Sequence, residues 1–202
     1  YSYFVNALLD VFEIEPDSKY LKLALTLGHH LINHFWDSEN NSFFMTSDDH
    51  EKLIIRPKSN YDLSLPSGNS VSSFVMLRLY HLSQEPSFLD ISMKIMESQA
   101  QTAAENPFGF GYLLNTLSLY LEKPVEITII NSENSDICKS LLTNYLPNSF
   151  MITIQNSNQL KNLSEYPFFA GKSFEDKTSV FICKNFTCSL ALHTLDEVNS
   201  TL

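Results

Sequence analysis

Polar and charged side chains are concentrated between positions 56 and 71, a part of the chain without helical or strand periodicity. The side chains that could take part in chemistry are Arg56, Lys58, Tyr61, Asp62, Ser67 and Asn69. A carboxylate can accept a proton, cations can hold an anion, and phenol, hydroxyl and amide groups can bind the hydroxyl groups of a ligand. The segment also precedes a predicted helix, whose free N–H groups favour anionic or hydroxyl-rich ligands. We therefore predict a ligand site with Asp62 as base and the other five as binding groups.

A structural interpretation of the same segment stays open beside the chemical one. Residues 66–69 are typical of a turn, with Ser67 as the N-cap of the following helix. Asp62 would then be a neighbouring cap or part of an Asx-turn. A helix start needs one capping residue, however, and not six polar groups of mixed sign.

Histidines offer a second set of candidates. His50 lies in a predicted turn just upstream of the polar segment, and we assign it to the same ligand site. His30 and His34 have the i, i+4 spacing of a metal pair. The sequence supplies neither the glutamate of a His-Glu-x-x-His motif nor an evident third ligand, so we predict surface histidines and neither a metal nor a cofactor.

The three cysteines are too few, and odd in number, for a secreted disulfide framework. Cys183 and Cys188 are separated by four residues, a wider gap than in the redox Cys-x-x-Cys motif, and no second pair completes a zinc site. We predict one buried strand thiol and one loop thiol, with a reversible disulfide as the alternative.

Composition limits the partners. The chain has 202 residues and a formal net charge of -10, which disfavours nucleic-acid backbones and anionic membranes as partners. No apolar run approaches the roughly 20 residues that span a bilayer, and no signal peptide opens the sequence. We expect a cytoplasmic protein that binds neither nucleic acid nor membrane.

Hydrophobic periodicity predicts a helical first part and an α/β second part. The predicted helices cover residues 1–12, 19–36, 67–83, 88–102 and 110–121, with a β-hairpin formed by 42–46 and 53–55. After Pro124 the pattern predicts strands at 125–130, 149–154 and 178–183 and helices at 136–145 and 194–202. Strand, helix, strand, crossover and strand are typical of a parallel sheet. The fold class is thus α+β and mostly helical, with domains at 1–123 and 124–202 and a three-stranded parallel sheet.

Several motifs together resemble one protein family. They are Arg56-Pro57-Lys58, Tyr61-Asp62, the run from Pro66 to Val71, and the tail from Val180 to Cys188, supported by Phe35-Trp36-Asp37, Phe43-Phe44 and Asp49-His50-Glu51. In this order they resemble the spermatogenesis-associated thioredoxin-domain family over essentially the whole chain. The sequence departs from the usual pattern at Ser59, where an acidic residue is common.

The resemblance implies a fold and a set of partners. Members carry a thioredoxin-like domain followed by an α/α toroid similar to six-hairpin glycosidases and N-acylglucosamine 2-epimerases. The chain would then be a C-terminal fragment with a partial toroid, and the polar segment would form a sugar-like ligand site at the toroid mouth. The alternative is a non-catalytic scaffold that supports the thioredoxin-like domain. A partial toroid leaves apolar helix faces uncovered, so we expect this fragment to self-associate.

Overall fold

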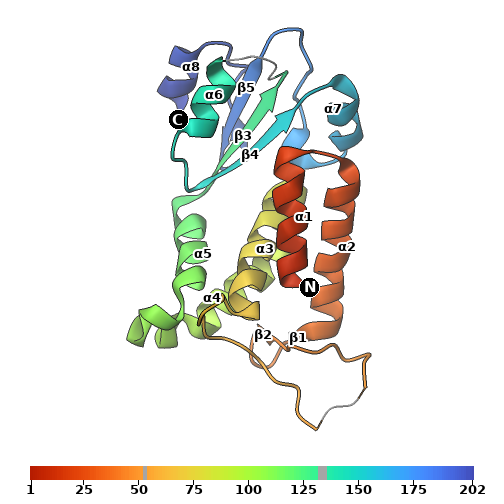
Figure 1. Ribbon diagram of the computed structural model, residues 1–202, viewed down its shortest axis with the longest axis vertical. Helices are drawn as coiled ribbons and strands as arrows, with labels where there is room; N and C mark the ends of the chain where they lie inside the picture. The colour runs from red at the N-terminus through yellow and green to blue at the C-terminus, as the bar shows by residue number, and fades with distance from the viewer. Residues whose placement is uncertain (52–53, 132–135) are drawn as a thin grey trace. The chain divides into compact units, whose positions relative to one another are not determined.

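The structure is a computed structural model that describes residues 1–51, 54–131 and 136–202. It is mostly helical with a small mixed β-sheet, which confirms the α+β class (Figure 1). The chain divides into two compact units: unit 1 comprises Tyr1–Leu9 and Leu21–Leu121, and unit 2 comprises Asp10–Tyr20 and Glu122–Leu202. Both units are discontinuous in sequence, whereas the sequence pattern predicted two continuous domains, 1–123 and 124–202.

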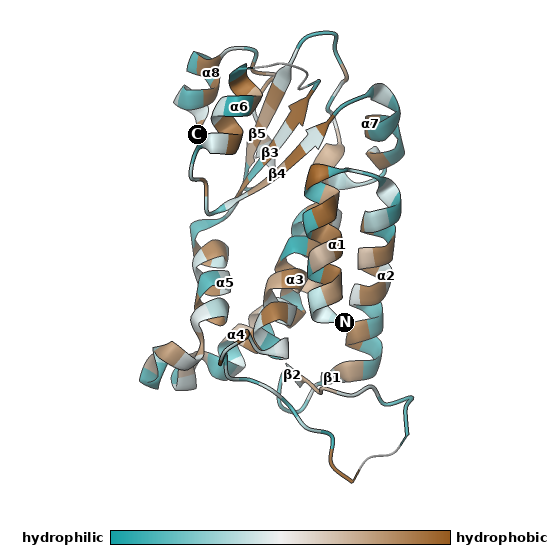
Figure 2. Ribbon diagram, viewed as in Figure 1, coloured by the Kyte–Doolittle hydropathy of each residue, from teal (hydrophilic) through white to brown (hydrophobic). Residues whose placement is uncertain are grey.

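The chain begins with two helices, α1 (Ser2–Ile14) and α2 (Ser18–Phe35). Pro16 lies in the turn between them, and the Asp17 carboxylate accepts a hydrogen bond from the backbone N–H of Lys19 at the start of α2. Each helix buries apolar residues at helical spacing, as the brown stripes of Figure 2 illustrate. These buried residues are Val5, Leu8, Leu9 and Phe12 in α1, and Leu21, Ala24, Leu31 and Phe35 in α2.

Three further helices belong to unit 1: α3 (Gly68–Ser83), α4 (Pro86–Glu105) and α5 (Gly111–Glu122, of which the last residue falls in unit 2). Helix α3 is buried along most of its length, and Ser73 and Ser92 join it to α4 through buried hydroxyl hydrogen bonds. A Cβ on Gly28 of α2 would lie 2.6 Å from Leu79 Cδ1, so any larger residue there would force the Leu79 side chain to move. The predicted helices therefore exist, whereas their arrangement as part of a toroid stays a prediction.

The predicted β-hairpin is wrong in its pairing. Strand β1 (Trp36–Asp37) pairs antiparallel with β2 (Ser42–Phe43), and Phe44 forms an isolated bridge with Lys58. Residues 54 and 55 form no strand and are exposed, while position 53 lies outside the described residues. The turn at 38–41 is short enough to pair the strands beside it, and Asn41 takes the left-handed φ of 49°. Residues 42 and 43 therefore pair with the nearer strand, whereas Phe44 and Met45 contact the distant segment at Lys58 and Pro57.

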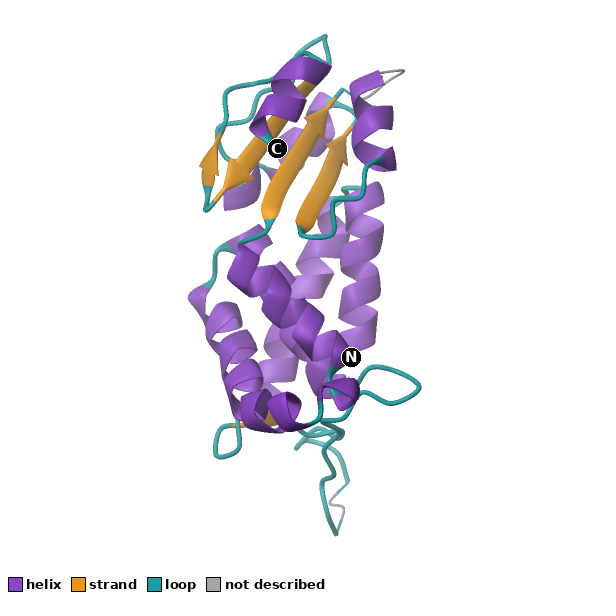
Figure 3. Cartoon of the chain, turned by 90° about the vertical axis from the view of Figure 1, so that its left-hand side faces the viewer, coloured by secondary structure: helices purple, strands orange, loops and turns teal. Residues whose placement is uncertain are grey.

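Unit 2 is built on a four-stranded sheet with the order β4-β3-β5-β6 (Figure 3). The strands are β3 (Val125–Ile130), β4 (Ser149–Ile154), β5 (Ser179–Lys184) and β6 (Thr187–Cys188). Helices α6 (Asp136–Thr143) and α8 (Leu195–Thr201) bury Ile137, Leu141 and Val198 against alternate strand residues, Ile127, Ile129, Val180 and Ile182. Strand alternation thus supplies the apolar face that the helices cover.

The predicted parallel, three-stranded sheet is corrected in two respects. Strands β3 and β4 are parallel, but β5 runs antiparallel to β3, and β6 adds a fourth strand. The connection from β4 to β5 contains a short helix, α7 (Ser157–Leu163), a 3-10 turn, η2 (Pro167–Phe169), and Gly171 with a φ of 73°. Residues 154 and 179 both pair with Ile130. The chain therefore returns to the sheet at the same end at which β4 left it, so β5 runs antiparallel to β3 and β4.

Cys183 and Cys188 form a disulfide across the β5–β6 hairpin, where they are directly opposite each other. The prediction of two separate thiols is therefore wrong, and the disulfide alternative is correct for this state. The two-residue turn at Asn185 and Phe186, both with positive φ, brings the strands into register. Cys138 is free.

Candidate functional site

Asp62 is bound on both carboxylate oxygens by backbone N–H groups. Its Oδ1 accepts from Ser67 N at 2.7 Å, and its Oδ2 accepts from Tyr112 N at 2.8 Å and Leu113 N at 3.4 Å. The Asp62 N–H donates to the carbonyl of Gly109 at 2.7 Å. The carboxylate therefore satisfies free N–H groups at the start of α5 and ties the polar loop to it. In this geometry it acts as a helix cap, and its assignment as a base stays a prediction.

Ser67 and Asn69 are also engaged within the protein. Ser67 is the N-cap of α3, since its Oγ accepts from Ser70 N at 3.0 Å. Asn69 is 3% exposed, and its Oδ1 accepts from Phe43 N at 2.6 Å. Its Nδ2 donates to the carbonyls of Phe43 and Ser59 and to Asn60 Oδ1. This amide therefore joins β2, the polar loop and α3.

Arg56 and Lys58 lie near the ring of Phe44, at 4.1 and 4.6 Å from its centroid. The Arg56 guanidinium donates to the carbonyls of His34 and Thr46. Lys58 forms a close ion pair with Asp37 of β1, and this hydrogen bond is the main reason why the pKa of Asp37 is held far below its ordinary value. Both cations are therefore engaged by groups of the protein, Arg56 by backbone carbonyls and Lys58 by Asp37, and they do not form a common anion site.

The remaining two predicted residues lie apart from this network. The Tyr61 ring packs on Phe110 with centroids 5.1 Å apart and is 49% exposed. His50 is exposed in the turn upstream of the loop. The described contacts thus bring Asp62, Ser67 and Asn69 together around the start of α3, while His50 does not join them.

A cavity of about 350 Å³ lies beside the loop within unit 1. Its described lining is largely aromatic and apolar, with a few small polar groups: Tyr1, Ser2, Tyr3, Leu31, Phe35, Phe43, Phe44, Met45, Ser59, Leu65, Pro66, Gly68, Asn69 and Ser72. Among the seven predicted site residues, Asn69 alone is part of this described lining. Sequence reasoning missed this aromatic wall because Phe35 and Phe43 fit the pattern of core residues. Their position in the sequence shortly before the polar segment 56–71 was the signal that could have indicated it.

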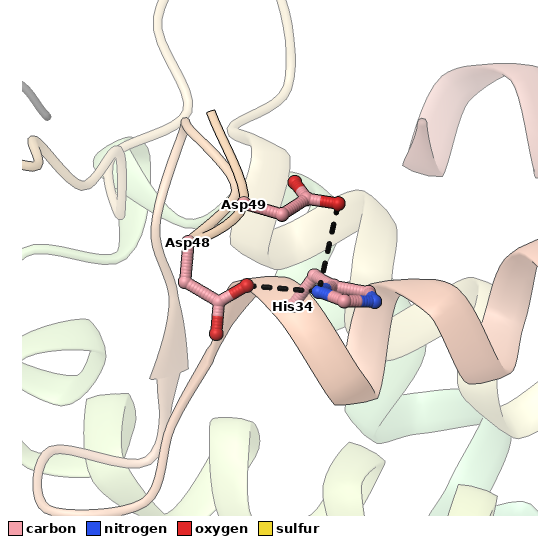
Figure 4. Close-up of side chains that lie close together, drawn as sticks. All are labelled: His34, Asp48 and Asp49. Atoms are coloured by element: carbon pink, nitrogen blue, oxygen red, sulfur yellow. Dashed lines mark hydrogen bonds and ion pairs between the residues drawn. The ribbon is translucent and has the colours of Figure 1, made fainter. Parts of the chain in front are cut away.

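A second group gathers at the end of α2, where His34 faces Asp48 and Asp49 (Figure 4). His34 Nδ1 is 2.8 Å from Asp48 Oδ1 and 3.9 Å from Asp49 Oδ2. One nitrogen and two carboxylates are ligand types that divalent cations bind, but exposed groups of this kind are common without an ion, and here His34 is paired directly with Asp48. Asp49 is also hydrogen-bonded by Ser47, which is the main cause of its lowered pKa. His30 contributes differently, because its ring stacks on that of His34 with centroids 4.5 Å apart. The i, i+4 spacing of His30 and His34 thus corresponds to a ring contact, and the acidic neighbours of His34 come from the turn that follows.

No helix in the described ranges is long and apolar enough to cross a membrane. A scan against protein-family models finds no match. Curated proteins match over the whole chain: spermatogenesis-associated protein 20 of Rattus norvegicus is 26% identical over 208 residues, and that of Homo sapiens is 25% identical over 208 residues. An uncharacterised protein of Caenorhabditis elegans is 20% identical over 98% of the chain.

These matches relate the chain to spermatogenesis-associated protein 20, a relation that the sequence motifs had predicted. The chain spans about a quarter of the length of these relatives, 26% of the rat and human proteins. The thioredoxin-like and glycosidase-like domains inferred from the resemblance stay predictions.

Proposed function

We propose that this relative of spermatogenesis-associated protein 20 binds a small, neutral, hydroxyl-bearing ring, such as a sugar, in the cavity beside residues 56–71. The observation that carries the proposal is the composition of the cavity wall. Its volume of about 350 Å³ is that of a small-molecule site. Phe35, Phe43 and Phe44 offer apolar surface to a ring, and Ser59 and Ser72 add hydroxyl groups.

The charges of the loop favour a neutral ligand. Arg56 and Lys58 are held by carbonyls and by Asp37, and neither belongs to the described lining. A phosphate or carboxylate ligand would need such a cation within hydrogen-bond reach. Hydroxyl groups need only the neutral donors and acceptors that the wall contains.

The proposal assigns binding and not catalysis to this part of the protein. A general base must reach the proton that it removes. The Asp62 carboxylate already accepts hydrogen bonds from Ser67, Tyr112 and Leu113 and is not among the described residues that line the cavity. Asp62 is therefore a positioning residue, which holds the loop that forms one side of the site.

Thermal-shift and NMR titrations with neutral mono- and disaccharides test the proposal. Ser72→Leu places a larger side chain into the cavity wall, and Ser87→Leu is the matched control at an exposed position of α4. We expect saturable binding by the original chain and by Ser87→Leu, and at least tenfold weaker binding by Ser72→Leu. Binding that is unaffected by Ser72→Leu, or no binding to any sugar of the panel, contradicts the proposal.

A scaffold is the second candidate function, and the exposed apolar residues of α1 favour it. Phe4 is 56%, Val11 40% and Ile14 82% exposed. Such a surface supports association with a protein partner, of which a thioredoxin-like domain of the same protein is the first to test. Protection of these residues in hydrogen exchange when that domain is added would favour the scaffold.

A further inference from the structure

The disulfide of unit 2 joins two sulfur atoms in very different surroundings. Cys183 is 1% exposed in the middle of the sheet, whereas Cys188 is exposed on the short edge strand β6. An attacking thiol can therefore reach Cys188 but not Cys183. Access helps to decide which sulfur of a disulfide is attacked, so we expect the attack at Cys188.

Lys172 brings a cation to the exposed sulfur. Its Nζ lies 3.8 Å from Cys188 Sγ and also donates to the carbonyl of Phe168. The ammonium lies near the rings of Phe168 and Phe181, at 5.4 and 6.0 Å from their centroids. A half-buried ammonium beside Cys188 stabilises this sulfur as a thiolate when it is released from the mixed disulfide.

An acidic group accompanies this lysine from the adjacent strand. Glu126 is 5% exposed on β3, where it is the register partner of Cys183. Burial lowers the pKa of Lys172 to about 8, and the charge of Glu126 opposes this shift. Lys184 follows Cys183 in the chain, but its ammonium is bound by the carbonyls of Thr201 and Leu202. Among the described residues, Lys172 is thus the cation in contact with Cys188, and Glu126 is the acidic register partner of Cys183.

We propose that Cys183 and Cys188 form a thiol–disulfide exchange site that reacts with dithiols, with Cys188 as the sulfur attacked and Lys172 as the group that stabilises its thiolate. This proposal does not depend on the sugar site of unit 1.

The exchange proceeds in two balanced steps. A thiolate of the dithiol attacks Cys188 Sγ, the bond between Cys183 and Cys188 breaks, and Cys183 leaves with the electron pair and takes a proton from solvent. The second thiol of the dithiol gives its proton to solvent, and the resulting thiolate attacks the first sulfur of the dithiol, which is bonded to Cys188 in the mixed disulfide. Cys188 then leaves as a thiolate beside Lys172. The dithiol is oxidised to a cyclic disulfide, and the protein pair gains two electrons.

The first experiment locates the attack. Cys138→Ser removes the free thiol in all proteins compared. The folded, oxidised protein is treated at pH 7 with dithiothreitol or, as the monothiol arm, with glutathione. We expect dithiothreitol to reduce the pair while the circular dichroism spectrum is retained, and glutathione to be trapped as a mixed disulfide on Cys188. Reduction only after unfolding, or a mixed disulfide on Cys183, overturns the proposal.

The second experiment tests Lys172 in the reduced protein. Alkylation of Cys188 by iodoacetamide is followed against pH by mass spectrometry. We expect Lys172→Met to raise the pH midpoint by about one unit, which makes alkylation at pH 7 about tenfold slower. Lys172→Arg should restore the rate because it retains the charge. Lys184→Met is the matched control and should leave the midpoint unchanged.

Two results of this experiment decide against the role of Lys172. One is a Lys172→Met profile that coincides with that of the parent protein. The other is an equal shift in Lys184→Met, which would indicate a general effect of charge near the hairpin. If Lys172→Met does not fold, Lys172→Arg and the trapping experiment still decide whether Cys188 is the reactive sulfur.

Discussion

The carboxylate of Asp62 accepts a hydrogen bond at 2.8 Å from the backbone N–H of Tyr112, fifty positions later in the chain. Together with the bond from Ser67 N, this contact makes one side chain the link between the polar loop and the starts of two helices, α3 and α5. A residue that a sequence pattern assigns to chemistry is thus used here to fix the backbone. The predictions below follow from such links.

Asp62→Ala should lower the free energy of unfolding by about 1–3 kcal/mol, because it leaves N–H groups of Ser67 and Tyr112 without their partner. Urea unfolding monitored by circular dichroism measures this change. Asp90→Ala is the control, since Asp90 forms an exposed pair with Lys94 and its loss should change stability by less than about 0.5 kcal/mol. Equal effects of the two substitutions would argue against the cap.

Asn69→Asp should destabilise unit 1 by about 2–4 kcal/mol. The amide Nδ2 donates to the carbonyls of Phe43 and Ser59, and a carboxylate oxygen at that place would face these oxygens without a hydrogen. Asn60→Asp alters one partner at the less buried end of the network and should cost less. Thermal unfolding of both variants ranks them, and the reverse order would contradict the network.

The Asp37–Lys58 pair should make the protein less stable as the pH falls below 4. The hydrogen bond from Lys58 depresses the pKa of Asp37 below its ordinary value of 3.8 in the folded state. The unfolded state therefore takes up protons first, and the stabilisation is present above pH 4 and is lost as the pH falls below it. Lys58→Met should flatten the dependence of the unfolding free energy on pH below 4. Urea unfolding between pH 2.5 and 7 measures the two slopes, and parallel slopes would count against the pair.

The chain as an isolated polypeptide should self-associate through α1. Phe4, Val11 and Ile14 expose apolar surface on this helix, and burying it stabilises by roughly 25 cal/mol per Å². We expect light scattering to give a mass above that of the monomer, and Phe4→Glu with Ile14→Glu to lower it. A monomer at all concentrations that binds no hydrophobic dye would refute this prediction.

The local elements could be read from the sequence because their causes are local. Strands at 125–130 and 149–154 have the predicted bounds, since β-branched runs between turn residues specify them. Ser67 caps α3 as its position before the apolar run indicates. Helix α4 begins at Pro86, two residues before the predicted start, because proline is compatible with the first turn of a helix. Helix α7 was missed because its seven residues carry few apolar positions.

Tertiary structure decided what depends on distant partners. The direction of β5 follows from the end of the sheet at which the chain returns. The residue types at positions 179–184 indicate a strand but not its direction. Asp62 and Asn69 appear as reactive groups in sequence, but backbone N–H and carbonyl groups from other segments take up their hydrogen-bonding capacity. Cys183 and Cys188 become a pair only because a hairpin sets them in register. Residue type thus determines which bonds a side chain can make, whereas only folding selects the partners.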